Sequence, residues 1–521
     1  MLKFFKSNLF FFLLLTIVVF SSYGKSIFFD FTYRDDNVLI LEKSDFLSDI
    51  KNIPQLFTTS CFYSNDFQYY RPVLNLFLLI ETTIFGVNNK IYHLTNIILF
   101  IFALYLMYVF LLKLNLNKTI LKLLIILFSV HPILTSSVVW IPARNDTLLA
   151  IFVFLSFIFF LKYLENNSIK NLILYVLFWT ISLFTKETAI LLLLLYPLFI
   201  YCFNYKLKKK EIIKNGFIFV FILIIYFYLR NISVSTNNSV QYLTDLILFF
   251  KVLFAGTSVY LYELFIPNNF PIMLYEIKLN IFHISSLVFS IIVIIVCLYK
   301  NLITKKILFF SFCWFFFFLL PTFLLLNDYI FFNHIIIISL FAFIFVLTTC
   351  IEFAIKKYPV SKKYMLILFS LLFVINSYCS FVQQNKYKNK YEYWVNTYFD
   401  APTYHGACYW ISHLYTESGN FKKAKEFLIN ANSLKPVYYS DLALIYYKEG
   451  DLGKAEEFYN KSIELGINKA QCYRNLSVIC LKKDNDADKA IKYAKLAVQE
   501  EPYDDEYKKY LEILESKKNE E

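Results

Sequence analysis

The stretch FFDFTYRDDNVLILE, residues 28–42, places two adjacent carboxylates, Asp35 and Asp36, directly after the first apolar run of the chain. That run extends from Leu9 to Phe20 and is preceded by two lysines. Because positive charge is retained on the cytoplasmic side of a membrane, this order predicts a cytoplasmic N-terminus. The acidic pair is then expected on the opposite, extracytoplasmic face.

The composition is that of an integral membrane protein. The 521 residues are 58% hydrophobic and 20% aromatic, and the mean hydropathy is +0.53. Membrane-spanning segments of this kind are helical, so we expect an all-α fold. The formal charge of +12 comes largely from lysines between apolar runs. We interpret these lysines as determinants of topology and expect no nucleic-acid partner.

Lysine clusters between the apolar runs are assigned to the cytoplasm, so an even number of spans must separate any two clusters. Two apolar segments are therefore placed on the external surface rather than across the membrane. Residues 72–86 are short and interrupted by Glu81, and a span at residues 246–265 would put two lysine clusters outside. With roughly 17–25 residues per span, about eleven spans remain, at 8–26, 92–112, 120–141, 146–164, 169–185, 187–205, 214–231, 281–299, 306–326, 330–354 and 364–382.

After Phe381 the sequence becomes charged and contains a repeat. Its small residues and turn glycines have the offsets of the tetratricopeptide helix pair, in which small side chains permit close helix packing. The third copy has Asn485 where glycine is usual. The three copies pass through Tyr415, Gly419, Ala424, Leu428, Ala431 and Pro436, then Tyr446, Gly450, Ala455 and Tyr459, and then Ala490, Ala494, Ala497 and Pro502.

This pattern predicts three regions: a membrane domain at residues 1–382, a linker at 383–402 and an α-solenoid of repeats at 403–521. The external loop of the membrane domain covers residues 27–91. Because the span count is odd, the repeat domain is expected outside, on the same side as the acidic loop.

Ionisable groups at the external ends of the spans are candidate functional residues, because burying an idle charge near a membrane is costly. Arginine binds phosphate through two parallel hydrogen bonds, and an ammonium adds charge. We expect phosphate binding by Arg71, Arg144, Lys186 and Arg230. We expect positioning roles for His93, Asn96, His131, Asp146 and Glu187.

Each of these groups also has a purely structural interpretation. His93 can be a core histidine, Lys186 and Glu187 can pair with each other, and Asp146 can cap the helix that follows it. Asp35 and Asp36 can be solvated loop charges. Taken together, however, the residues describe a polar cavity of mixed charge at one membrane face, which suits an anionic headgroup.

Five segments in one order resemble the GT-C glycosyltransferases, specifically the transmembrane and tetratricopeptide-repeat O-mannosyltransferases and their bacterial relatives. The resemblance covers residues 28–502, with Ala143 where a glycine is expected. A second departure is Asn-Asp-Tyr at residues 327–329. The segments are FTYRDDNVLI, YYRPVLNLFLLIETTIFGVN, YHLTNIILF, FSVHPILTSSVVWIPARNDTLLAIF and LFTKETAILLLLL.

The resemblance implies a hexose donor linked to polyprenyl phosphate or dolichyl phosphate, with mannose as the expected hexose. The acceptor would be an extracytoplasmic hydroxyl group on a polypeptide held by the repeats. One carboxylate of the Asp35/Asp36 pair would act as general base in an inverting transfer while the other orients the acceptor. Arg144, Arg71 and Lys186 would stabilise the departing phosphate.

No cofactor is required by this chemistry, and no protein metal site is predicted, although a divalent cation at the aspartate pair is a further option. Two alternatives remain open at this point. The sugar acceptor can be a glycan or a lipid, or the chain can be a non-enzymatic transporter or scaffold that carries a repeat domain.

Overall fold

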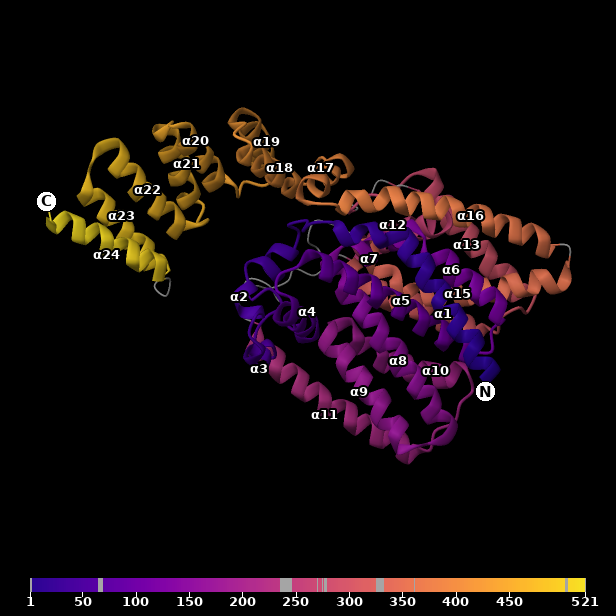
Figure 1. Cartoon of the computed structure of the whole chain (residues 1–521). Helices are drawn as coiled ribbons and strands as arrows, with labels where there is room; N and C mark the ends of the chain where they lie inside the picture. The colour runs from indigo at the N-terminus through magenta and orange to yellow at the C-terminus, as the bar shows by residue number, and fades with distance from the viewer. Residues whose placement is uncertain are drawn as a thin grey trace. The chain divides into compact units, whose positions relative to one another are not determined.

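The structure is a computed structural model that describes residues 2–63, 69–234, 246–268, 270–273, 275, 279–324, 332–359, 361–501 and 505–520. Throughout these ranges the chain is helical and contains no strand, as predicted. It divides into two compact units, Met1–Tyr393 and Trp394–Glu521, which Figure 1 shows in indigo to orange and in orange to yellow. The unusual sequence at 327–329 and Pro502 lie outside the described residues.

The first unit is a bundle of long apolar helices joined by short turns and one long loop (Figure 1). Its helices are α1 (Leu2–Tyr23), α2 (Ser44–Leu47), α3 (Ile53–Leu56), α4 (Pro72–Phe85), α5 (Asn89–Lys113), α6 (Lys118–Ser129), α7 (Thr135–Val139), α8 (Arg144–Asn166), α9 (Ile169–Thr185), α10 (Leu192–Cys202), α11 (Lys209–Ser233), α12 (Leu246–Phe265), α13 (Ile281–Tyr299), α14 (Lys305–Leu324), α15 (Ile336–Lys357) and α16 (Ser361–Gln383).

Nine helices among the described residues are long and apolar enough to cross a membrane. Eight of them coincide with predicted spans, and the ninth is α12, the segment that we expected on the external surface. The predicted span at 120–141 is a pair of helices bent by 61°, which would make ten if it counts as one crossing. Two other predicted spans, α9 and residues 187–202, are apolar but shorter.

The end of the first span and the end of the last span lie side by side. The Gln384 side chain donates to the Ser22 carbonyl at 2.9 Å, and Lys25 Nζ donates to Asn385 Oδ1 at 2.8 Å. Further along both segments, the Asp30 amide donates to the carbonyl of Lys388 at 2.9 Å. The helices α1 and α16 therefore run in the same direction, and the first unit ends on the face that carries the acidic loop.

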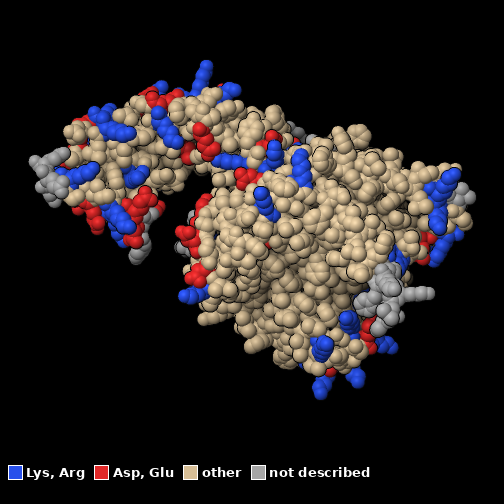
Figure 2. Space-filling view, in the orientation of Figure 1, with Lys and Arg blue, Asp and Glu red and all other residues tan. Residues whose placement is uncertain are grey.

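Contacts at the opposite end of the bundle bring the lysine-rich turns together. Tyr163 at the end of α8 donates to Glu211 at the start of α11, at 2.5 Å. Lys306 at the start of α14 donates to Asn204, after α10, at 3.2 Å. Figure 2 shows a broad surface of the first unit almost without charged side chains, with most of the Lys and Arg in view at its edges. This separation of apolar surface and basic edge is typical of a membrane protein.

The segment at residues 72–86, which we expect on the external surface, forms the 14-residue helix α4. Pro72 occupies its first turn, where a missing amide hydrogen costs nothing. Gly86 follows the helix with a φ of 67°, a left-handed conformation that glycine adopts without strain. Together these residues fix the two ends of α4 and keep it short.

The second unit stacks antiparallel helix pairs at the positions expected for the repeats. A left-handed residue separates the two helices of each pair: Gly419 at φ 75°, Gly450 at φ 89° and Asn485 at φ 51°. Asparagine tolerates this conformation better than most side chains, so it replaces glycine in the third pair. The helices are α18 (His405–Glu417), α19 (Phe421–Leu434), α20 (Tyr439–Glu449), α21 (Leu452–Glu464), α22 (Lys469–Asp484), α23 (Ala487–Glu500) and α24 (Asp505–Glu520).

The small residues of the repeat pattern lie where the paired helices touch. Ala424, Ala431, Ala455, Ala490 and Ala497 are fully buried. A larger side chain at these positions would force the helices apart or leave its rotamer minimum. The repeat therefore stacks through the residues that the sequence pattern singled out.

Candidate functional site

The acidic loop begins with a tight turn that buries one aspartate and leaves its neighbour accessible. Asp36 is 1% exposed, and its Oδ2 accepts hydrogen bonds from the Thr32 amide at 2.7 Å and the Thr32 hydroxyl at 3.0 Å. Burial raises the pKa of Asp36 to about 7, although the two Thr32 bonds oppose this shift. Asp35 adopts a left-handed φ of 68°. The side chain of Asp35 remains 35% exposed.

Asp35 Oδ1 lies 3.8 Å from Arg34 Nε. Asp35 also shares an electrostatic influence on one tyrosine, Tyr69, with residues just before α4 and just after α9. Burial raises the pKa of the Tyr69 phenol, and the charges of Arg71, Glu187 and Asp35 all act on that phenol. The guanidinium of Arg71 lies over the Tyr69 ring, 4.4 Å from its centroid. The structure thus brings three predicted site residues around one tyrosine.

Arg71 and Glu187 form an ion pair at the edge of this group. Arg71 Nε lies 3.5 Å from Glu187 Oε2, and the two side chains are 17% and 32% exposed. The other Glu187 oxygen accepts from the Tyr70 amide at 3.2 Å. Glu187 therefore pairs with Arg71 rather than with its neighbour Lys186, and both members of the pair remain partly accessible.

Lys186 pairs instead with Asp146 at the start of α8. Lys186 Nζ donates to Asp146 Oδ1 at 2.7 Å, and His334 Nε2 lies 3.6 Å from Asp146 Oδ2. The charge of the Asp146 carboxylate also acts on the Arg71 guanidinium. Lys186, Asp146 and His334 therefore belong to one charged cluster with Arg71 and Glu187. We did not predict His334, although it lies at the external end of a predicted span, the same signal that singled out His93.

Arg144 is enclosed in a separate network. Its guanidinium is fully buried and forms an ion pair with Glu81 of α4. It also donates to Asn96 Oδ1 at 2.7 Å and to the Tyr92 carbonyl at 2.8 Å, both on α5. Arg144 thus connects α8, α4 and α5, and no sequence pattern indicated Glu81 as its partner. Phosphate binding by Arg144 remains a prediction.

The two predicted histidines are buried at different places. His93 is 1% exposed and meets the ring of Phe29 edge-on, with centroids 6.2 Å apart. His131 Nδ1 accepts from the Ile133 amide at 3.3 Å and begins a short helical turn. Its ring stacks on Phe128 with centroids 5.4 Å apart. The contacts of His131 are thus those of a capping residue, and its positioning role stays a prediction.

Arg230 is in the last turn of α11, at the same end of the bundle. Tyr226, one turn earlier, packs against Tyr70 with ring centroids 5.7 Å apart. Ser233 at the end of the helix donates to the Phe57 carbonyl at 3.2 Å. These contacts place the end of α11 beside the external loop, next to the residues that precede Arg71.

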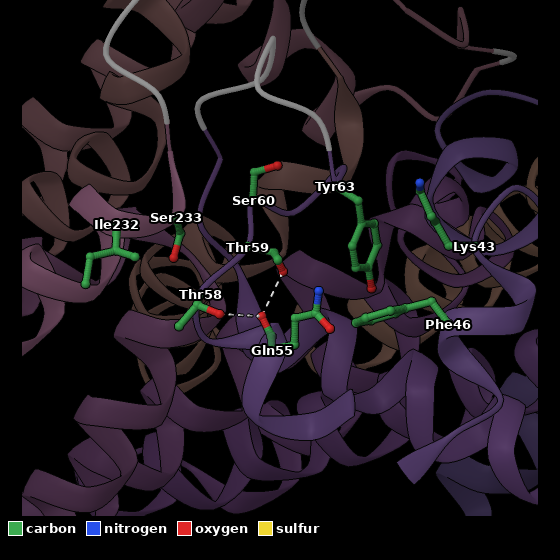
Figure 3. Close-up of a pocket in the computed structure, with 9 residues that line it drawn as sticks. All are labelled: Lys43, Phe46, Gln55, Thr58, Thr59, Ser60, Tyr63, Ile232 and Ser233. Atoms are coloured by element: carbon green, nitrogen blue, oxygen red, sulfur yellow. Dashed lines mark hydrogen bonds between the residues drawn. The ribbon is translucent and has the colours of Figure 1, made fainter. Parts of the chain in front are cut away.

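A cavity of about 330 Å³ opens where the external loop meets the end of α11 (Figure 3). None of the predicted site residues lines it. The lining combines polar side chains with two aromatic rings and one isoleucine. It consists of Lys43, Phe46, Gln55, Thr58, Thr59, Ser60, Tyr63, Ile232 and Ser233.

Across the part of the chain that the structure describes, no three His, Cys, Asp or Glu side chains come together as metal ligands. Asp36 directs one oxygen to Thr32 rather than toward a site shared with Asp35. The possibility of a divalent cation at the aspartate pair therefore stays an untested prediction.

Comparison with known families identifies the second unit. The model of the tetratricopeptide repeat matches residues 405–438 and 436–465. These segments are tetratricopeptide repeats. The third helix pair, α22 and α23, lies beyond the matched residues but repeats the buried alanines and the left-handed turn. No curated protein matches the chain.

The tetratricopeptide repeats carry aromatic side chains covered by lysines. The Tyr446 ring stacks on Phe458 at 5.5 Å. It also has Lys425 Nζ 4.8 Å and Lys454 Nζ 5.3 Å from its centroid. Stacked repeats of this type form extended surfaces that bind other polypeptides. A polypeptide partner is consistent with these repeats.

Proposed function

We propose that the protein is a membrane glycosyltransferase that moves a hexose from a polyprenyl- or dolichyl-phosphate carrier to a hydroxyl group of a protein. The observation that carries this proposal is the gathering of Asp35, the Arg71–Glu187 pair and the Lys186–Asp146 pair at one end of an apolar helix bundle. A carboxylate beside two cations is the combination that transfer from a lipid phosphate requires.

The two aspartates have different roles in this proposal. Asp35 is the general base, because its side chain is accessible to an acceptor hydroxyl. Asp36 is a positioning residue: its hydrogen bonds to Thr32 close the turn that presents Asp35. As the acceptor oxygen bonds to the sugar carbon, Asp35 takes its proton and the bond from that carbon to the phosphate oxygen breaks.

Arg71 and Lys186 are the residues that we assign to stabilise the phosphate leaving group. Both cations are partly exposed, and each is already held by a carboxylate, Glu187 or Asp146. Such pairing keeps a cation in place without fully neutralising its field. Arg144 and Arg230 act less directly. Arg144 holds α4 in place through Glu81, while Arg230 belongs to the helix end beside Tyr70.

The repeats are proposed to hold the acceptor polypeptide outside the cytoplasm, and mannose is the hexose we favour from the sequence resemblance. The parallel course of α1 and α16 supports the location, because the chain leaves the first unit on the side of the acidic loop. The cytoplasmic N-terminus rests on the lysine distribution.

The test is sugar transfer in sealed vesicles that contain the full-length protein, radiolabelled polyprenyl-phosphate mannose or glucose, and extracted membrane and secreted proteins. Asp35→Asn should lower transfer by about 10³-fold, within the range for loss of a general base. Asp45→Asn is the matched control, since Asp45 is exposed in the same loop. Equal activity of the wild type and Asp35→Asn, or no transfer by the wild type, would refute the proposal.

Fractionation of the labelled product separates this function from its closest alternative. Label in protein that is released by β-elimination supports a hydroxyl acceptor on protein. Label confined to glycan or lipid fractions would support transferase activity but would show that the acceptor is not a protein.

A further inference from the structure

The cavity beside the external loop is built from two separate parts of the chain. Most of its lining comes from the segment between Lys43 and Tyr63, and the remainder from Ile232 and Ser233 at the end of α11. Ser233 ties the two parts together through its hydrogen bond to the Phe57 carbonyl at 3.2 Å. The cavity is therefore formed by tertiary packing rather than by a single loop.

Several polar groups in the lining have capacity for a ligand. The Tyr63 hydroxyl is buried without a hydrogen-bond partner among the described residues. A buried phenol normally finds such a partner, so the position favours a ligand oxygen. Figure 3 shows the side-chain amide of Gln55 pointing toward the rings of Tyr63 and Phe46.

The hydroxyls on the other side of the cavity are oriented by the backbone. Thr58 and Thr59 donate to the Gln55 carbonyl at 3.2 and 3.0 Å. Because each hydroxyl donates its hydrogen to that carbonyl, its oxygen lone pairs remain able to accept from a ligand hydroxyl. This side of the cavity therefore offers acceptors, while the Gln55 amide and the Lys43 ammonium offer donors.

The charge and shape of the lining restrict the class of ligand. Among the residues that the structure describes, this lining contains one cation, Lys43, and no carboxylate. The ammonium lies 5.9 Å from the centroid of the Tyr63 ring, and the Phe46 and Tyr63 rings meet edge-to-face at 5.2 Å. A phosphate is usually held by arginine forks or several cations, and the described part of the lining has neither. Two aromatic rings surrounded by separate hydrogen-bond donors and acceptors suit an uncharged ligand ring that carries several hydroxyl groups.

We propose that this cavity binds a hexose unit of a glycan. The sugar hydroxyls would bond to Tyr63, Gln55 and the two threonines, and its C–H face would pack on the aromatic rings. A volume of about 330 Å³ is at the small end of ligand pockets, which occupy roughly 300–1,000 Å³. The site is separate from the charged cluster and does not depend on the transfer activity.

The experiment measures binding of the full-length protein in nanodiscs to an array of neutral hexose oligosaccharides, followed by calorimetry with the glycan bound most tightly. Loss of one hydrogen bond costs about 1 kcal/mol, so Tyr63→Phe and Gln55→Ala should each weaken binding about fivefold. Tyr205→Phe, at the opposite end of the bundle, and Lys51→Met, an exposed lysine of the same loop, are the matched controls and should bind as the wild type does.

Absence of binding to every hexose glycan, or equal binding by the wild type and Tyr63→Phe/Gln55→Ala, would overturn the proposal. Displacement of the glycan by inorganic phosphate at equal concentration would overturn it in favour of an anion site. The wild type separates this proposal from the proposed function, because Asp35→Asn should lose transfer and still bind glycan. If the wild type binds glycan but transfers no sugar, the binding site stands and the transferase is rejected. If the wild type transfers sugar but binds no hexose glycan, the transferase stands and the binding site is rejected.

Discussion

Arg71 and Arg144 lie at the same end of the bundle, and both were predicted to bind phosphate, yet their surroundings differ. Arg144 is fully buried, and Glu81, Asn96 and a carbonyl group take up its donors. Arg71 is 17% exposed, and its ion pair with Glu187 is longer, at 3.5 Å. A buried pair holds helices together, whereas a partly exposed pair can exchange a partner for a ligand. Residue type alone therefore does not distinguish a phosphate ligand from a link between helices.

The largest effect is expected from breaking the buried pair. Arg144→Met leaves the Glu81 carboxylate buried without its counter-ion, which should cost about 3–5 kcal/mol of stability. Chemical unfolding of the full-length protein in detergent measures this loss. The double variant Arg144→Met/Glu81→Met should recover most of it, since both charges are then absent. If Arg71→Met destabilised the protein equally, the contrast between the two arginines would be wrong.

The two aspartates also differ in burial, since Asp36 is buried and Asp35 is partly exposed. The pH dependence of stability should reveal the buried one. Asp36 has a pKa of about 7 in the folded chain against 3.8 ordinarily. Between about pH 4 and pH 7 unfolding releases the proton of Asp36. The contribution of Asp36 to stability is therefore greatest below about pH 4 and falls until about pH 7. From about pH 5 to 7 the fall should amount to about 2 kcal/mol. Thermal unfolding of Asp36→Asn should lack this part of the decline, with Asp45→Asn as the control.

A smaller effect, on catalysis, should follow from changing the shape of the exposed cation. Arg71→Lys keeps the charge but loses the planar fork, so we expect transfer to fall about tenfold, mainly in kcat/KM for the donor. Its unfolding midpoint should stay close to that of the wild type. A large loss of stability with unchanged transfer kinetics would give Arg71 the role that we assign to Arg144.

The smallest effect is expected at His334, which touches the same cluster through Asp146. His334→Gln should raise the donor KM about threefold, in line with a weak, partly exposed interaction. The measurement is the donor concentration dependence of transfer from about pH 6 to 8. A change in kcat alone would contradict a role that acts through Asp146.

The fold was more predictable than the site. Apolar runs and buried alanines such as Ala424 and Ala455 produce patterns that are local in sequence, so helices and repeats could be predicted from them. The position of Asn485 in a left-handed turn followed from the repeat offsets. The role of α12 was harder, because its length and composition permit a crossing and only lysine counting argued against one.

The pairing of charges could not be predicted because it depends on helix packing. Glu81 and Arg144 are 63 positions apart and meet only when α4 packs near the start of α8. Lys186 has Glu187 as its neighbour but pairs with Asp146, and its backbone is extended where α9 ends. The cavity beside the loop likewise joins residues 43–63 with Ile232 and Ser233. Adjacency in sequence gave the wrong partner for Lys186 and no partner for Arg144.

The hydrogen bonds between residues 22–30 and 384–388 also set an order for biosynthesis. The acidic loop emerges early from the ribosome, but the acceptor of its Asp30 amide is made some 350 residues later, after α16. A chain that stops before Lys388 would leave the Asp30 amide without this acceptor and the early helices without their neighbour. Assembly of the candidate site is thus coupled to completion of the membrane domain.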